Sequence, residues 1–172
     1  MKDFYELAKN RFSVRSYSDK PVEDEKLTKI LEAGLLAPTA RNCQPQKIYV
    51  VKSEENRKKL SAVTPCTFSA PVILVVCYDE SRAAAGKVVP GYSFGNTDAA
   101  IVCTHMMLEA AELGLGSCWV GWFAEDEVKN ALDLPDGVRV CDLLPIGYAS
   151  ENAAPSKMHT DCRTLEDTVE YI

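Results

Sequence analysis

The hydrophobic positions of the chain recur with two different periods, which together predict a mixture of helices and strands. Within residues 19–38, Leu27, Leu31 and Leu35 recur every four positions, as they do on one face of an amphipathic helix. Residues 96–116 are apolar almost all round, so we expect this second long helix to be central and buried. Shorter helical patterns occur at residues 2–11, 53–63 and 124–135.

The extended patterns predict strands between these helices. Residues 70–79 are apolar and rich in β-branched side chains, which is typical of a strand covered on both faces. The alternating run TVEYI at residues 168–172 resembles an edge strand that could dock elsewhere, and a second subunit is one candidate partner. Residues 80–94 lack a clear period and are expected to form a loop. Further strands are expected at residues 47–52, 117–123 and 138–149.

The order of these elements favours an α+β fold around one sheet. Helices and strands do not follow the regular βαβ cadence of a doubly wound fold, and Gly114 and Gly116 follow a helix rather than a strand. The glycine fingerprint of a dinucleotide-binding βαβ unit is therefore missing. At this length we expect residues 1–172 to form a single domain.

Composition and charge narrow the possible partners and location. The net charge of −6 argues against nucleic acid and anionic membranes as partners. We find no apolar run near the roughly 18 residues of a membrane helix, and the charged start MKDFYELAKN does not resemble a signal peptide. We therefore expect a cytoplasmic protein. The seven cysteines contain no CxxC pair, which favours free thiols over a metal site or disulfides.

Two polar segments are candidates for ligand binding. In NRFSVRSYSD, residues two apart would point the same way, so Arg11, Ser13 and Arg15 would share one side while Phe12 and Val14 turn toward the core. Two guanidinium groups with a hydroxyl between them match the oxygens and charge of a phosphate. The alternative is a pair of solvated arginines in a loop.

The second segment, PTARNCQPQ, follows the first long helix. Thr39, Asn42 and Gln44 supply donors and acceptors next to Pro38, and side-chain amides suit the pyrimidine edge of a heterocycle. The same residue types also stabilise turns, which is the alternative interpretation.

Two further segments carry weaker signals. In GLGSCWVG, small residues would let the backbone approach a flat ligand, with an amide near Gly121 donating to a ring atom; otherwise they simply end a helix. In the tail, Lys157, His159 or Arg163 could reach a phosphate, or the tail could be solvated. His105 lies on an apolar helix and is expected to be a hydrogen-bonded core residue.

No hydrolase, P-loop or metalloprotease motif is found in the sequence. An anion-and-heterocycle site without an evident acid, base or nucleophile indicates an enzyme whose cofactor carries the chemistry.

These segments, in this order and over nearly the whole chain, resemble the nitroreductase family of FMN-dependent oxidoreductases. The resemblance implies an α+β fold with a central, mostly antiparallel sheet flanked by helices. It also implies a homodimer with exchanged C-terminal tails and one FMN in each of two clefts at the subunit interface. The matching pieces are RFSVRSY, APTARNCQPQ, DAAIVCTHMMLEAAELGLGSCWVG and GYASENAAPSKMH.

The resemblance assigns roles to matching positions. The phosphate, ribityl chain and part of the ring would be held by Arg11, Phe12 (mainly through its backbone), Ser13 and Arg15. From the second subunit, the flavin would be reached by Pro38, Thr39, Ala40, Asn42 and Gln44. The backbone facing the ring near N5 would be that of Val120 and Gly121, and the phosphate ligands in the tail would be Lys157 and, more weakly, Arg163.

The implied reaction is a ping-pong oxidation of NAD(P)H that reduces nitroaromatics, quinones or similar small acceptors, with hydride transfer at flavin N5 and no catalytic side chain. The alternatives are a reductive flavoenzyme with a non-nitro acceptor and a non-catalytic FMN-binding module.

The chain departs from the family pattern at three positions. Arg or His is frequent at the position of Phe12, Ser is common at that of Ala40, and Trp is frequent at that of Gln46. The short segment 80–94 also lacks the helices that larger members insert over the substrate, so the pocket would be open.

Overall fold

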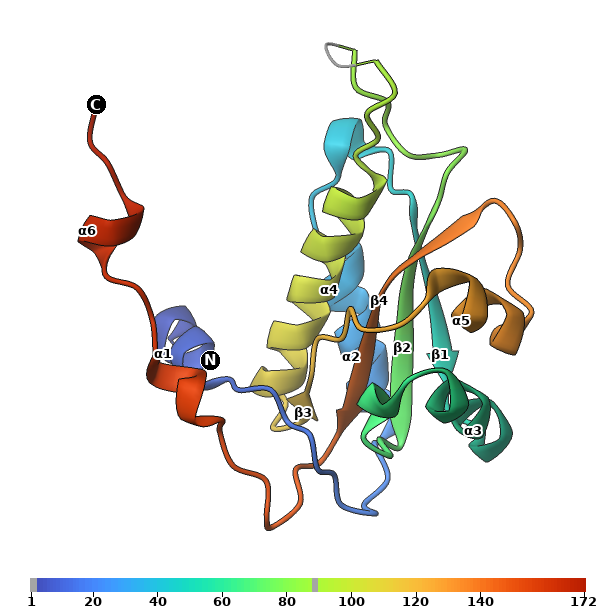
Figure 1. The fold of residues 1–172 in the computed structure, drawn as a ribbon. Coiled ribbons are helices and arrows are strands. Elements are labelled where there is room, and N and C mark those ends of the chain that lie inside the picture. Colours follow the sequence, from blue (N-terminus) through green and yellow to red (C-terminus); the bar gives the residue numbers. More distant parts are fainter. Residues whose placement is uncertain (1–2, 88–89) are drawn as a thin grey trace.

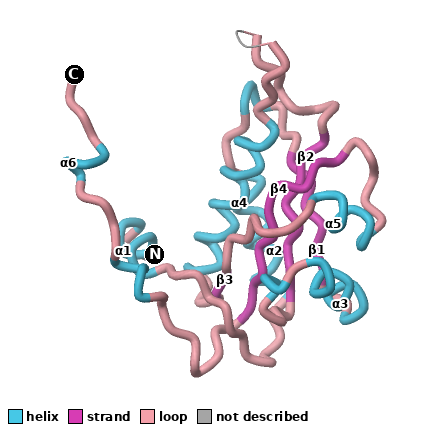
Figure 2. Tube along the Cα trace, viewed as in Figure 1, coloured by secondary structure: helices cyan, strands magenta, loops and turns pink. Residues whose placement is uncertain are grey.

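A computed structural model describes residues 3–87 and 90–172 of the chain. Within them the strands form a four-stranded antiparallel sheet in the order β1-β2-β4-β3 (Figure 2). The strands are β1 (Gln46–Val51), β2 (Val72–Asp79), β3 (Gly116–Ser117) and β4 (Val138–Gly147). The expected α+β fold with an antiparallel sheet is confirmed.

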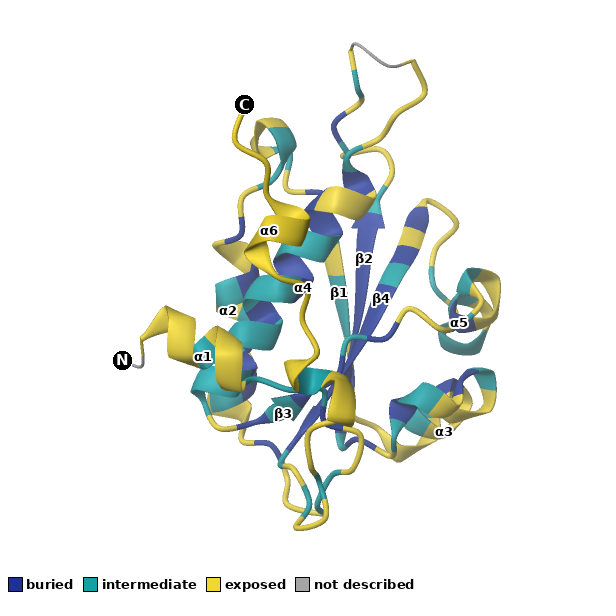
Figure 3. Cartoon of the chain, turned by 60° about the vertical axis from the view of Figure 1, so that its left-hand side comes forward, coloured by how far each residue is buried: buried dark blue, intermediate teal, exposed yellow. Residues whose placement is uncertain are grey.

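Helices cover both faces of the sheet, giving three layers. Helices α1, α2 and α4 lie on one side, and α3 and α5 lie on the other (Figure 3). Among the described residues, no helix combines the length and apolar character that crossing a membrane requires. The helices are α1 (Phe4–Asn10), α2 (Asp24–Leu35), α3 (Glu54–Val63), α4 (Gly95–Glu112), α5 (Glu125–Leu132) and the short α6 (Leu165–Thr168).

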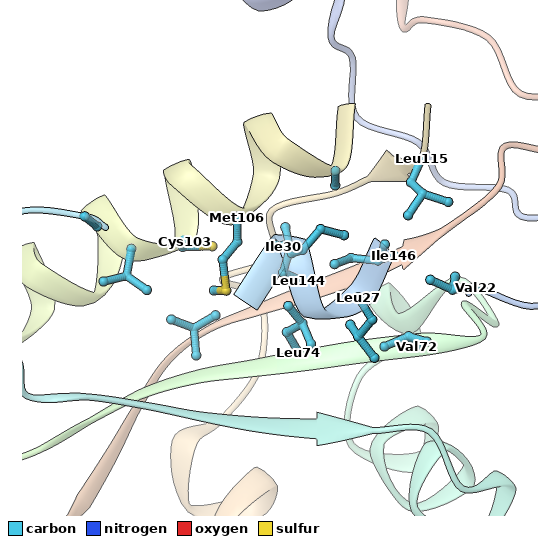
Figure 4. Close-up of a cluster of buried hydrophobic side chains, with 14 of the residues drawn as sticks. Val22, Leu27, Ile30, Val72, Leu74, Cys103, Met106, Leu115, Leu144 and Ile146 are labelled. Carbon is cyan, nitrogen blue, oxygen red and sulfur yellow. The ribbon is translucent and has the colours of Figure 1, made fainter. Parts of the chain in front are cut away.

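Alternate residues of β2 pack into two separate hydrophobic clusters. On the side of α2 and α4, Leu74 packs with Ile30 and Met106 (Figure 4). On the side of α3 and α5, Val75 joins a cluster that also holds Leu60. Both faces of this strand are therefore covered, as its continuous apolar run predicted.

The strand expected at residues 117–123 is much shorter in the structure. Its ladder of hydrogen bonds with β4 is interrupted at Pro145. The carbonyl of Pro145 accepts from the amide of Cys118, but proline has no backbone N–H to donate in return. Pairing resumes only where Val120 and Leu143 exchange backbone hydrogen bonds at 2.9 Å. The segment then leaves the sheet and continues to α5 (Figure 1).

Within one chain, residues 168–172 do not form the expected edge strand, and its docking on a second subunit stays a prediction. Thr164 caps α6 by accepting from the amide of Asp167, so Thr168 is helical rather than extended. Residues 169–172 contain no strand, and Tyr171 is 98% exposed. The tail leads away from the body of the protein and offers its last residues no sheet edge to pair with (Figure 1).

Two other expectations concern the burial of α4 and the loop at residues 80–94. Helix α4 is buried only on the face toward the sheet, whereas Ile101, His105 and Leu108 are half-buried, so neither the helix nor His105 is enclosed as expected. The described part of residues 80–94 contains no helix or strand beyond one bridge between Ala85 and Ser93. Residue 2 of the expected first helix and residues 88–89 of this loop lie outside the described residues.

Candidate functional site

The N-terminal segment with the two arginines is held in extended form against the end of the sheet. Val14 donates its amide to the carbonyl of Ser117 at 2.9 Å and is buried against Gly116. The hydroxyl of Tyr17 lies 2.9 Å from the Val14 carbonyl and 3.1 Å from that of Pro145. Burial raises the pKa of Tyr17, so this hydroxyl stays a neutral donor that fixes the segment.

The side chains on the other side of this segment line a cavity of about 280 Å³. The structure therefore brings Arg11, Ser13 and Arg15 together, as their alternation predicted. The tail closes the cavity with a short 3₁₀ turn, Lys157–Thr160, and the residue before it. The lining residues are Arg11, Phe12, Ser13, Arg15, Ser156, Met158 and His159.

Phe12 does not turn toward the core as expected. Its ring lies edge-to-face with the imidazole of His159, with the ring centres 6.2 Å apart. The extended segment runs along the end of the sheet rather than through the interior, and Phe12 finds its aromatic partner in the tail.

The guanidinium groups of this cavity keep donors available for a ligand. Arg15 makes one long contact, 3.4 Å, to the carbonyl of Ser13. Within the described residues neither Arg11 nor Arg15 forms a salt bridge, although acidic residues outnumber basic ones in the chain. Two unneutralised guanidiniums beside hydroxyl groups match an anionic, polyhydroxylated ligand.

The two basic tail residues named from the sequence lie differently. Lys157 begins the 3₁₀ turn but does not line the cavity, and Arg163 donates to the carbonyl of Asp167 inside the tail. Their proposed phosphate contacts stay predictions. Sequence reasoning missed Ser156 and Met158, and a lone serine before a short turn gave no signal for them.

The loop at residues 38–44 has a constrained backbone. Arg41, Asn42 and Gln44 have φ of 56°, 54° and 48°, in the left-handed region that non-glycine residues rarely adopt. The backbone N–H of Gln44 donates to Thr39 Oγ1 at 3.1 Å, and its side-chain Nε2 donates to Asn42 Oδ1 at 3.1 Å. Pro38, Asn42 and Gln44 are exposed, whereas Thr39 and Ala40 are half-buried.

Asp98, which the sequence did not single out, anchors this loop. It is 1% exposed in the first turns of α4, and its Oδ1 accepts from the amide of Ala40 at 2.8 Å. Its Oδ2 is buried without a hydrogen-bond partner among the described residues. An acidic residue in the first turn of a mostly apolar helix was the available signal.

The two halves of the predicted site do not meet within one protomer. The loop at residues 38–44 lies at the start of α4, whereas the arginine segment lies beside β3, which follows its other end (Figure 1). At 1.5 Å per residue, α4 spans roughly 20 Å from Asp98, which holds the loop, to Glu112, its last residue.

The segment after β3 carries the predicted ring-facing backbone. Val120 is buried and paired with Leu143, whereas no atom lies within 4 Å of where a side chain on Gly121 would begin.

Among the described residues, the cysteines show no sign of a nucleophile or a metal site. Burial raises the pKa of the Cys118 thiol, an effect that the nearby Arg15 opposes, so the thiol stays protonated rather than serving as a nucleophile. All seven cysteines are free thiols. Over residues 3–87 and 90–172, no three His, Cys, Asp or Glu side chains gather as a metal site would require.

Together, the fold and the cavity define an α+β protein with donors that match a phosphate-bearing ligand. A model described as the nitroreductase family matches residues 8–66 and 64–148. The chain therefore belongs to the nitroreductase family, and the resemblance seen in its sequence is confirmed.

Relatives and solved structures agree with this assignment. A protein of Methanothermobacter thermautotrophicus, provisionally named NADH dehydrogenase/NAD(P)H nitroreductase, is 32% identical, with 92% of this chain and 87% of that protein covered. The crystal structure of a nitroreductase family protein from Clostridium difficile 630 is 37% identical with a TM-score of 0.91, covering 99% and 98% of the two chains. An FMN-dependent nitroreductase from Clostridium difficile R20291 is 30% identical with a TM-score of 0.77, covering 96% of each chain.

Proposed function

We propose that this chain is an FMN-dependent oxidoreductase that uses NAD(P)H to reduce nitroaromatics, quinones or similar small acceptors by a ping-pong mechanism. The observation that carries the proposal is the cavity in which Arg11, Ser13 and Arg15 converge with His159. The printed names of the relatives, which include an FMN-dependent nitroreductase and an NAD(P)H nitroreductase, support the cofactor and the electron donor.

The donors of the cavity fit FMN chemically. Arg11 and Arg15 supply planar forks for a phosphate monoester, whose charge of about −1.5 to −2 needs two cations for balance. The hydroxyls of Ser13 and Ser156 suit the ribityl chain, which is itself a row of hydroxyls. The open backbone at Gly121 leaves room for the edge of a flat ring, with Val120 fixing its position through β4.

When bound, FMN would accept hydride at N5 and pass the electrons on to the acceptor. The overall reaction with a quinone balances as NAD(P)H plus a proton plus quinone, giving NAD(P)+ and hydroquinone. The residues of the chain bind and orient the cofactor, and backbone donors and cations stabilise negative charge on the ring. A hydrogen bond to a charged group contributes about 1.5–3 kcal/mol.

We further propose that the working unit is a homodimer in which each FMN lies between the arginine segment of one copy and residues 38–44 of its partner. The roughly 20 Å separation along α4 supports this arrangement, because neither half can reach the other within one chain. The half-buried side of α4 and the exposed Leu165 and Tyr171 of the tail are surfaces that a second copy would cover.

Steady-state kinetics test this function. The protein is loaded with FMN and desalted, and oxidation of NADH and NADPH is followed with 1,4-benzoquinone and with 4-nitrobenzoate. We expect turnover, with parallel double-reciprocal lines when donor and acceptor are varied together. A bound flavin that neither nicotinamide cofactor can reduce would point instead to a non-catalytic FMN-binding module, and a failure to retain FMN would reject the proposal.

A further inference from the structure

Trp122 has an exposed ring on a firmly held backbone. Its side chain is 80% exposed, although Trp is highly buried on average in folded proteins. The carbonyl of Trp122 accepts from the hydroxyl of Thr64 at 2.7 Å, and Thr64 itself is buried. Phe123 packs against the hydrophobic cluster on the α3 and α5 side of the sheet. The backbone is thus fixed on both sides of an indole that faces solvent.

The position of this indole relates it to the proposed flavin site. Ser117, the residue before Cys118, lies against the arginine segment, because it forms a bridge with Ser13 and its carbonyl accepts from the amide of Val14 at 2.9 Å. From Cys118, the chain needs only three residues, about 10 Å when extended, to reach Gly121. Trp122 is the first side chain beyond the open backbone of Gly121, against which the proposed flavin ring would lie.

The exposed apolar side chains of α1 and of the last residues of the tail belong to a different surface. Phe4 and Tyr5 lie on α1, and Leu165, Tyr171 and Ile172 lie on the tail. Figure 3 shows α1 and α6 on one side of the sheet, whereas the segment of Trp122 leads into α5 on the other. Trp122 is therefore not a continuation of the apolar surface that the tail and α1 present.

We propose that Trp122 is a specificity-determining residue, an aromatic platform on which planar aromatic electron acceptors stack as they enter the flavin site. This inference rests on the proposed function and deepens it by naming the acceptor class that the site favours. An indole is large, rigid and polarisable, so a face-to-face or offset contact would favour quinones and nitroarenes. A compact, non-aromatic acceptor such as ferricyanide would gain nothing from it.

The test uses the FMN-loaded protein with Trp122→Ala, Trp122→Phe and Tyr5→Ala, the last being a control that removes an exposed aromatic ring from α1. KM and kcat are measured with 1,4-naphthoquinone and with ferricyanide at saturating NAD(P)H. The second readout does not depend on turnover: equilibrium dialysis gives the dissociation constant of 2-naphthoate, a planar aromatic that the enzyme cannot reduce in this way. FMN affinity and far-ultraviolet circular dichroism check that each variant is folded and loaded.

For Trp122→Ala we expect KM for naphthoquinone and the dissociation constant of naphthoate to rise about tenfold, which corresponds to about 1.4 kcal/mol at 25 °C. Ferricyanide kinetics and FMN affinity should stay within twofold of the wild type. Trp122→Phe should recover most of the loss, and Tyr5→Ala should match the wild type.

The inference is overturned if Trp122→Ala leaves naphthoquinone and naphthoate unchanged, or if it impairs both acceptors equally. Equal impairment together with a lower dimer mass would make Trp122 a subunit contact instead. Failure of the wild-type protein to turn over ferricyanide or naphthoquinone would reject the proposed function itself, which separates the two failures.

Discussion

Arg15 is the side chain on which the proposed phosphate contact depends most directly. It lines the cavity from a segment fixed by Val14 and Tyr17, so its removal should leave the backbone in place. We expect Arg15→Ala to weaken FMN binding by about 2 kcal/mol, roughly 30-fold, because charge-assisted hydrogen bonds are lost. Fluorescence titration with FMN measures this, with Arg82→Ala, a change in an exposed turn, as the control. Wild-type affinity in Arg15→Ala would remove Arg15 from the site.

Asp98 acts on the second half of the site through a backbone contact. Asp98→Ala would leave the amide of Ala40 without its acceptor and relax the left-handed loop beside it. We expect FMN affinity to fall about tenfold, with a loss of about 1–2 kcal/mol in the free energy of unfolding. Asp98→Asn keeps an oxygen for this amide and should restore most of the affinity. The interpretation fails if titration shows the two variants binding FMN as tightly as the wild type.

Residue spacing predicted part of this site and could not predict the rest. The alternation of Arg11, Ser13 and Arg15 placed all three in one cavity, because an extended chain fixes side-chain direction. The same rule sent Phe12 toward the core, but direction alone does not say whether a core or the imidazole of His159 lies there. Asp98 was missed because its role depends on a contact with Ala40, 58 residues away in the chain.

Among the elements, β3 and the arginine segment fit together only because Gly116 lacks a side chain. A Cβ there would come within 2.5 Å of the Val14 side chain. We expect Gly116→Ala to push the segment off the sheet, lowering the free energy of unfolding by about 1–3 kcal/mol and weakening FMN binding. Thermal melts and FMN titration measure both effects.

Gly137→Ala is the matched control for Gly116→Ala, since no atom lies within 4 Å of its added Cβ. It should unfold and bind FMN like the wild type. Equal behaviour of the two alanine variants would show that the contact of Val14 with Gly116 does not position the arginine segment.

The last residues of the tail, from Leu165 to Ile172, are exposed on their own chain. Ending the chain after Thr164 removes α6 and the exposed residues that follow it. We expect this truncation to lower the dimer's association constant, because the tail's apolar side chains would lose their contacts with a second copy. Light scattering over a range of protein concentrations measures the mass, and an unchanged mass would show that the tail lies outside the interface.

Element type was more predictable than element ends. The periodic patterns predicted α2, α4 and β2 well, because burial imposes the period on the sequence. The strand at 117–123 was overestimated because Pro145, which interrupts its ladder, lies on another strand. The alternating tail was taken for a strand because a pattern shows which residues could share a face, not whether a neighbouring edge exists.

At the scale of the whole molecule, α4 determines how the site can be assembled. It separates the loop at residues 38–44 from the arginine segment by roughly 20 Å, which supports the proposal that one complete site forms between two copies. The sequence did not place these groups relative to the long helix. The structure shows that they lie near its two ends, and that the helix is straight between them and half-buried on one side (Figure 1).

A mixed dimer tests this shared site most directly. One copy carries Arg15→Ala and the other Asn42→Ala, each with a different affinity tag so that the mixed dimer can be isolated. If each site takes its arginines from one copy and its loop from the other, one site of the pair is doubly altered and the other is intact. The account predicts one FMN bound with wild-type affinity per mixed dimer. FMN bound no more tightly than by either parent variant would contradict it.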